Sequence, residues 1–484
     1  MKAILTGLVF LAALPVSADE STEQLRQEFE SYKRASETRI QTLENQISNR
    51  TDLTEDEITA IRKLNDRATL DFEFHGYLRS GYGIDGHGNA QVAFQAPNAE
   101  SKYRLGNEAE TYLETVFLAK TPPETTGSKD KKFETQIRLA YSIPNSNNAQ
   151  YDSTFSLREA YGIAGGLIAD NPTATWWAGQ RFYSRIQVHM SDFWYRDMSG
   201  YGGGMENIQI GDSAKVGLAW IGGSIDTLDS DGTVFVNPDG QLRKDNLDLS
   251  LTEIALLGGE FRALLTYSHF NGDVLESSPG VTNNVKSSHG AAVNLFQINN
   301  FDNGIQNLAV VQYGLGPAYN FRAELGLPTG FGPGNTPGNG GTIETEDFRQ
   351  FRFIEDITYD AGKKVSASAC ALYQYSYLGN VPMNTVQWGS LGIRPVYHFN
   401  RHYSLATEAG WDYTDQKDGE SGSLFKLTFA PQITPEMSVL SRPALRMFFT
   451  YAWWSDDFIN MVGTPTHTGE THGLSAGVQL ETWW

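Results

Sequence analysis

The chain of 484 residues has a formal net charge of −20 and a single cysteine, so an internal disulfide is excluded and nucleic acid is a disfavoured partner. Tyrosine (22), tryptophan (10), phenylalanine (26) and glycine (48) are abundant. Interfacial aromatics and many turn formers are typical of a membrane-spanning β-barrel rather than of a soluble protein.

Residues 1–18 have the pattern of a secretory signal peptide. Lys2 supplies the basic start, residues 3–14 are apolar, and residues 16–18 offer a small-residue cleavage site. We therefore expect the mature chain to begin near Asp19. Beyond this point the sequence has no run of about 18 apolar residues, so helical membrane spans are not expected.

Residues 19–68 predict a periplasmic helical extension, because they lack glycine, are highly charged and carry apolar residues three, four or eight positions apart. These apolar residues are Leu25, Phe29, Tyr32, Ile40, Leu43 and Ile47. A helix with one narrow apolar stripe needs a partner, and an oligomeric coiled coil is the simplest arrangement. The alternative is a lone amphipathic or partly disordered helix.

From Leu70 onward the sequence alternates between apolar and polar residues and is punctuated by turn formers, which predicts β-strands. The remaining residues, at roughly 23 for a strand and its connection, allow on the order of 18 strands. A barrel of that size encloses water. Residues 474–484 alternate without a break and end in Trp484, with one face suited to lipid and the other to water. Residues 70–484 therefore predict an all-β barrel in the bacterial outer membrane.

The period of two also assigns side chains to faces of the barrel. Phe72, Phe74 and Leu78 take the lipid face of one strand, which leaves Tyr77 and Arg79 in the lumen. The same parity places in the lumen Tyr112, Glu114, Trp388, Arg394, Glu481 and Trp483. These rings could belong to aromatic girdles or simply fill space. A pyranose, however, has an apolar C–H face and a rim of hydroxyls, so rings beside Arg and Glu favour sugar binding.

Several motifs resemble the maltoporin family of carbohydrate-specific porins and keep its order. They are residues 74–77 (FHGY), 101–108 (SKYRLGNE), 178–183 (AGQRFY), 189–193 (HMSDF), 392–395 (GIRP), 441–444 (SRPA) and the final Trp483-Trp484. The helical segment before Leu70 is absent from maltoporins proper and resembles the extension of the sucrose porin. The resemblance implies a homotrimer of eighteen-stranded barrels, each with a file of aromatic rings and an inward-folded third loop.

The resemblance also implies individual site residues. The aromatic track comprises Tyr77, Tyr112, Trp388 and Trp483, with Tyr151 in place of a ring from a neighbouring subunit. The constriction and polar track comprise Arg79, Arg104, Glu114, Arg158, Arg185, Asp192 and Trp194. Gln187 replaces an acidic constriction residue, and Ala291 or a gap replaces a track phenylalanine. Ala93 and Ala109 occupy the positions of a loop disulfide, so the chain departs from the family pattern and the preferred sugar need not be maltodextrin.

Other chemistry finds little support in the sequence. Residues 467–472, with Glu470 between two histidines, lie in a turn region, so we expect no metal site there. Residues 229–232 resemble a calcium loop but lack the distal glutamate, although calcium on exposed loops stays open. The sequence has no phosphate-binding loop and no Gly-x-Ser-x-Gly elbow, so we expect neither an enzyme nor a bound cofactor.

These observations together predict a sugar-selective channel for maltodextrin, sucrose or other oligosaccharides. Two alternatives stay open. A general porin would have purely structural aromatics, and a structural protein would use residues 19–68 to contact the cell wall or periplasmic partners. The expected partners of a channel are oligosaccharides, outer-membrane lipid and further copies of the same chain.

Overall fold

The computed structural model describes residue 34 and residues 70–484 apart from several gaps. The gaps are residues 123–130, 144–153, 225–226, 229–233, 236–242, 279–280, 325–341 and 380–382. The predicted signal peptide, nearly all of the predicted helical extension, Tyr151 and residues 229–232 therefore lie outside the described residues. Contacts group Leu70–Trp484 as one unit, separate from Met1–Thr69.

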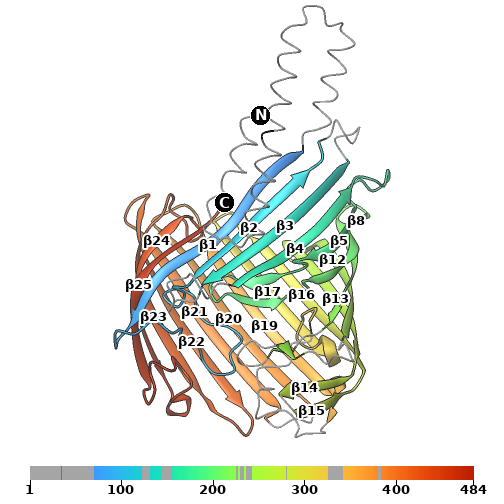
Figure 1. Cartoon of the computed structure of the whole chain (residues 1–484). Helices are drawn as coiled ribbons and strands as arrows, with labels where there is room; N and C mark the ends of the chain where they lie inside the picture. The colour runs from blue at the N-terminus through green and yellow to red at the C-terminus, as the bar shows by residue number, and fades with distance from the viewer. Residues whose placement is uncertain are drawn as a thin grey trace, which may run out of the picture. The chain divides into compact units, whose positions relative to one another are not determined.

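Eighteen antiparallel strands form one closed sheet in the described part of the chain (Figure 1). They are β1 (Asp71–Asp85), β2 (Thr111–Lys120), β3 (Lys132–Ile143), β4 (Thr154–Gly165), β5 (Thr175–Arg181), β8 (Gly200–Ile210), β9 (Ala214–Ser224), β12 (Arg243–Leu256), β13 (Gly259–Asn271), β16 (Ser288–Asn300), β17 (Ile305–Leu315), β19 (Phe348–Tyr359), β20 (Val365–Leu378), β21 (Thr385–His398), β22 (Tyr403–Gln416), β23 (Ser421–Ile433), β24 (Ala444–Trp454) and β25 (His472–Trp483). Each strand pairs with the next, and β25 pairs with β1 to close the barrel. The predicted all-β barrel is confirmed.

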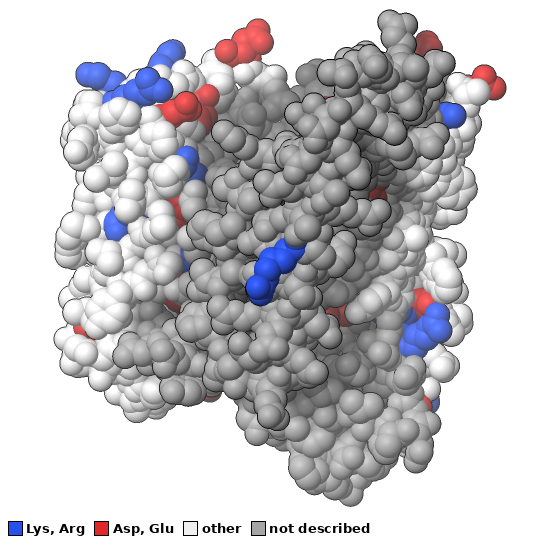
Figure 2. All heavy atoms as spheres, turned by 45° about the horizontal axis from the view of Figure 1, so that its top comes forward, with Lys and Arg blue, Asp and Glu red and all other residues white. Residues whose placement is uncertain are grey.

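Burial alternates along the strands as the period of two predicted. In β24 every second residue from Ala444 to Trp454 is buried. Phe72 and Phe74 of β1 are 67% and 52% exposed on the outer face, whereas Ser475 and Glu481 of β25 are buried. Figure 2 shows broad uncharged stretches on the described surface, with charged side chains of both signs gathered along its upper edge. Apolar side chains on the outer face and polar side chains on the inner face are expected for a barrel with lipid outside and water inside.

The longest connections all leave the same end of the barrel, as the extracellular loops of such barrels do. Three matter below: L1 (residues 86–110), L3 (182–199) and L9 (455–471). The connections contain the short strands β6 (Ile186–Val188), β7 (Phe193–Arg196), β10 (Thr227–Leu228), β11 (Val234–Phe235), β14 (Val274–Ser278), β15 (Val281–Val285) and β18 (Thr342–Ile343), and the 3-10 helices η2 (Gly316–Ala318), η3 (Thr345–Asp347) and η4 (Asp456–Phe458). Within the described ranges no helix combines the length and apolar character needed to cross a membrane.

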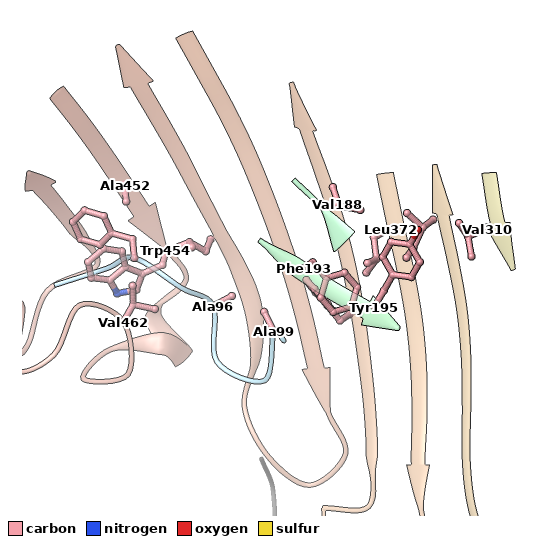
Figure 3. Packing of buried hydrophobic residues seen from close by; sticks show 14 of the residues in the cluster. Ala96, Ala99, Val188, Phe193, Tyr195, Val310, Leu372, Ala452, Trp454 and Val462 are labelled. Carbon is pink, nitrogen blue, oxygen red and sulfur yellow. The ribbon is translucent and has the colours of Figure 1, made fainter. Parts of the chain in front are cut away.

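L1 and L3 fold into the barrel and form a core with its inner wall. One buried cluster joins Phe94 of L1 and Phe193 of L3 to Trp388 of β21. Figure 3 shows Phe193 on β7 with Ala99 of L1 on one side of it and Tyr195 and Leu372 on the other. The third long loop therefore folds inward, as the family resemblance implied, and L1 joins it.

Candidate functional site

L3 is held against the inner wall by buried hydrogen bonds and ring packing. The backbone carbonyl of Tyr195 accepts hydrogen bonds from Arg352 of β19 at 2.7 Å and from Gln312 of β17 at 3.2 Å. The ring of Phe193 meets the ring of Trp388 edge-on, with 5.0 Å between centroids. L3 therefore covers the lumenal side of the wall from β17 to β21.

L1 covers the next part of the wall. The hydroxyl of Tyr103 hydrogen-bonds the hydroxyl of Ser390 at 2.8 Å, and its ring lies against Gly392 and Gly410, where no side chain projects. The carbonyl of Leu105 accepts a hydrogen bond from the Thr428 hydroxyl at 3.0 Å. The lumen is therefore narrowed from two sides, by L1 and by L3.

Three of the predicted rings lie side by side on the strands where the barrel closes. Trp483 of β25 is directly opposite Tyr77 of β1. Tyr112 of β2 is diagonal to Tyr77, and their ring centroids are 6.2 Å apart. Such registers bring opposite side chains to about 5 Å and diagonal ones to about 8 Å. Trp483 is 38% exposed and both tyrosines are half-buried, so three partly accessible rings lie on three adjacent strands; they are here called the aromatic track.

Arg104 of L1 anchors the middle of the aromatic track. Its guanidinium donates a hydrogen bond to the Tyr77 hydroxyl at 2.7 Å and pairs with Glu108 at 2.9 Å and Glu481 at 3.2 Å. Glu481 also pairs with Arg442 at 2.6 Å. Arg104 and Glu481, both predicted to be lumenal, are thus brought together beside the track, where they fix the Tyr77 ring.

The other charged residues beside the track hold its two ends. The Arg442 guanidinium lies 4.3 Å from the centroid of the Trp483 ring, and that of Arg79 lies 5.2 Å from the centroid of Tyr112. The Tyr112 hydroxyl donates a hydrogen bond to Glu114 at 2.6 Å. Each ring is therefore positioned by a polar or charged neighbour, and its accessible face adjoins hydrogen-bonding groups.

The remaining predicted constriction residues gather around Phe182, at the start of L3. The Arg185 guanidinium lies 4.3 Å from the Phe182 ring centroid and 3.6 Å from that of Trp194. The Arg158 guanidinium lies 5.3 Å from Phe182. The indole nitrogen of Trp194 donates to Asp192 at 3.2 Å. This arginine–aromatic cluster is the second part of the candidate site, and Arg79 reaches Asp192 at 3.9 Å to connect it with the track.

Sequence reasoning missed several residues of the site, among them Glu108 and Arg442 beside the aromatic track. Phe182 and His189 lie within motifs that carry the family resemblance, yet no alternation assigns a face to a loop residue. Arg138 of β3 donates to Glu114 at 2.6 Å and lies 5.1 Å from the Phe182 centroid. Its strand has the alternation that could have revealed it, but β3 pairs irregularly with β4 at this point.

Opposite charges are paired throughout the site. Arg79, Arg104, Arg138 and Arg185 each have a carboxylate partner within 4 Å. In the part of the chain that the structure describes, Arg158 is the exception. Burial and then the charge of Arg104 lower the pKa of the His189 imidazole in L3, so this ring is neutral at pH 7. Most of the described charges beside the aromatic track are therefore compensated.

The structure separates the other predicted track residues from the aromatic track. Trp388 points inward as predicted, but only 1% of it is exposed because Phe193 covers the ring. Its indole nitrogen donates to Asp412 at 3.0 Å. A solute could stack on Trp388 only if L3 moved.

Ala291 is exposed while its neighbour Ala292 is buried, so Ala291 faces outward and does not stand in for a lumenal ring. The Gln187 side-chain carbonyl is buried without a partner among the described residues.

Comparison with protein families agrees with the motif resemblance. A family model described as LamB porin matches residues 72–484. Among solved structures, the outer membrane channel DcaP of Acinetobacter baumannii is 14% identical, with a TM-score of 0.46 over 86% of this chain and 98% of that chain. OccK3 (OpdO) of Pseudomonas aeruginosa is 10% identical, with a TM-score of 0.45 over 88% of this chain and 98% of that chain.

Proposed function

Because this chain belongs to the LamB porin family and is an outer-membrane porin, we propose that it is a homotrimeric, sugar-selective channel for oligosaccharides such as maltodextrins or sucrose. The aromatic track of Trp483, Tyr77 and Tyr112 carries the proposal. A pyranose can lay its C–H face on each ring while Arg and Glu side chains bind its hydroxyls. Stacking is weak enough for a sugar to pass from ring to ring.

The paired charges support a neutral sugar as the solute. Arg104 is bound by two carboxylates and the Tyr77 hydroxyl, so its charge is compensated and it is not free to capture an anion. Trp194, whose ring is held by Arg185 and Asp192, is proposed to lie at the constriction. Its large ring is expected to set the width of the solute that passes.

Ion current through the purified protein in a planar bilayer tests the proposal. Maltose, maltotriose, sucrose and a cellodextrin are titrated in turn. Saturable block by at least one of them is expected, and the order of the dissociation constants ranks the substrates. A current that none of the sugars reduces would contradict selectivity and leave a general diffusion porin.

Replacing Tyr112 by Ala is expected to weaken sugar binding about two- to twelve-fold. The change removes one stacking ring, worth roughly 0.5–1.5 kcal/mol by analogy with aromatic pairs. Current-block titration measures the change. Tyr82→Ala is the matched control, because Tyr82 lies on β1 with its ring 63% exposed on the outer face, and it should leave the affinity unchanged. Equal affinities in wild type and Tyr112→Ala would remove Tyr112 from the track.

We also propose that residues 19–68 contact the cell wall or periplasmic partners and take no part in conduction. A variant lacking these residues is expected to keep the conductance and the sugar affinity of the full chain, because the site lies wholly within residues 70–484. Bilayer currents of the two proteins make the comparison, and binding to isolated peptidoglycan tests the contact. A deletion variant that loses sugar block would assign the segment to the channel itself.

A further inference from the structure

Three metal-ligating side chains converge on the loop side of the barrel, away from the aromatic track. They are His87 at the start of L1 and His467 and Glu470 in L9. His87 Nε2 lies 3.1 Å from Glu470 Oε1, and His467 Nδ1 lies 2.8 Å from Glu470 Oε2. All three sets of ligand atoms lie within 4.8 Å of one another. Two imidazoles and a carboxylate therefore face a common point.

The backbone around this cluster is fixed by hydrogen bonds. The Asp85 carboxylate accepts the backbone N–H of His87 at 2.9 Å and the backbone N–H of Asn89 at 2.7 Å. The carbonyl of Glu470 accepts the indole N–H of Trp454 at 3.0 Å. Beneath the cluster, Gly86 donates to the Leu474 carbonyl at 2.9 Å, which ties the end of β1 to the start of β25. The ligand-bearing segments are thus held in place before any ion binds.

His467 is the buried member of the cluster. Only 2% of it is exposed, and its ring packs against Phe94 of L1 and Trp454 of β24 with centroid separations of 5.4 and 6.2 Å. Its Nε2 is buried without a hydrogen-bond partner in the described ranges, while Nδ1 is aimed at Glu470. Hydrophobic packing alone does not explain a buried imidazole that directs one nitrogen toward a partly exposed carboxylate. This orientation suits a metal ligand.

We propose that His87, His467 and Glu470 bind one zinc ion, with water in the fourth position. Tetrahedral zinc with ligand bonds of about 2.0–2.1 Å requires ligand atoms about 3.3 Å apart. Glu470 Oε2 lies 2.8 Å from His467 Nδ1 and 3.2 Å from His87 Nε2, and the ligand atoms of the three residues all lie within 4.8 Å of one another. Two nitrogen donors favour zinc over calcium or magnesium. The ion joins L1 to L9 across the seam where the first and last strands meet. This differs from the sequence-based expectation of no metal, because His87 lies 383 residues before Glu470.

Zinc titration of the metal-free, detergent-solubilised protein against a chromophoric chelator tests the site. One zinc ion per chain is expected, and His87→Ala and Glu470→Gln should each weaken binding at least about tenfold. His402→Ala, in an exposed turn, is the control and should bind as the wild type does. Unchanged sugar-free conductance of His87→Ala shows that the barrel is folded.

Two outcomes would overturn the proposal. The first is equal zinc binding by wild type and His87→Ala. The second is loss of binding only in His289→Ala, because His269 and His289 form another close pair, with ring centroids 4.7 Å apart. X-ray absorption at the zinc edge independently identifies the ligands of the bound ion. Two imidazole ligands support the site, and an all-oxygen shell contradicts it.

Discussion

Gly392→Ala is expected to widen the pore and to increase the sugar-free conductance. A Cβ atom at this position of β21 would lie 2.0 Å from the Tyr103 ring, which is itself 2% exposed and has no room to retreat. Such overpacking typically costs about 1–3 kcal/mol, enough to shift the balance between the inward and displaced positions of L1 by roughly 5- to 150-fold. Displacing Tyr103 also breaks its hydrogen bond to Ser390.

Gly389→Ala on the same strand provides the control for that experiment. An added Cβ at Gly389 meets nothing within 4 Å, so its conductance and sugar affinity should match the wild type. In Gly392→Ala the sugar affinity should fall as well, because L1 carries Arg104, which positions Tyr77. A Gly392→Ala channel with wild-type conductance and affinity would show that L1 tolerates the clash and does not limit the pore.

Much of the barrel could be predicted from the sequence because a strand that faces lipid on one side and water on the other must alternate between apolar and polar residues. That rule gave Tyr77, Tyr112 and Trp483 their inward orientation without any knowledge of strand neighbours. Strand register then places them in one file, since each lies on a strand that pairs with the next. The alternation also places Trp388 on the lumenal face, which is correct. It cannot show that Phe193 of L3 covers the Trp388 ring.

What could not be predicted lies in the loops. L1 and L3 have no period that assigns faces, and their inward positions depend on partners distant in sequence, such as the Tyr103 ring against Gly392. The same holds for Phe182, around which three arginines gather, and for His87 beside Glu470. A single sequence supplies the residue types for these contacts, whereas the pairing follows from the closed sheet.

Glu481→Gln is expected to destabilise the seam of the barrel and to weaken sugar binding together. Glu481 is 3% exposed and pairs with Arg104 at 3.2 Å, Arg442 at 2.6 Å and Arg446 at 2.8 Å. Removing one partner of a buried ion pair leaves uncompensated charge and typically costs about 3–5 kcal/mol. The same arginines hold Tyr77 and Trp483, so the track should loosen when the carboxylate is lost.

Resistance to heat unfolding in detergent, followed by the mobility shift of the unfolded chain, measures the stability change, and current block measures the affinity. Glu253→Gln is the matched control, because Glu253 pairs with Lys215 at 2.6 Å while its side chain is 49% exposed, and such pairs contribute only about 0–1 kcal/mol. If both variants unfold at the same temperature, the lumenal water must screen Glu481 as fully as solvent screens Glu253. A Glu481→Gln channel that unfolds early yet binds sugar normally would separate the stability of the seam from the positioning of the track.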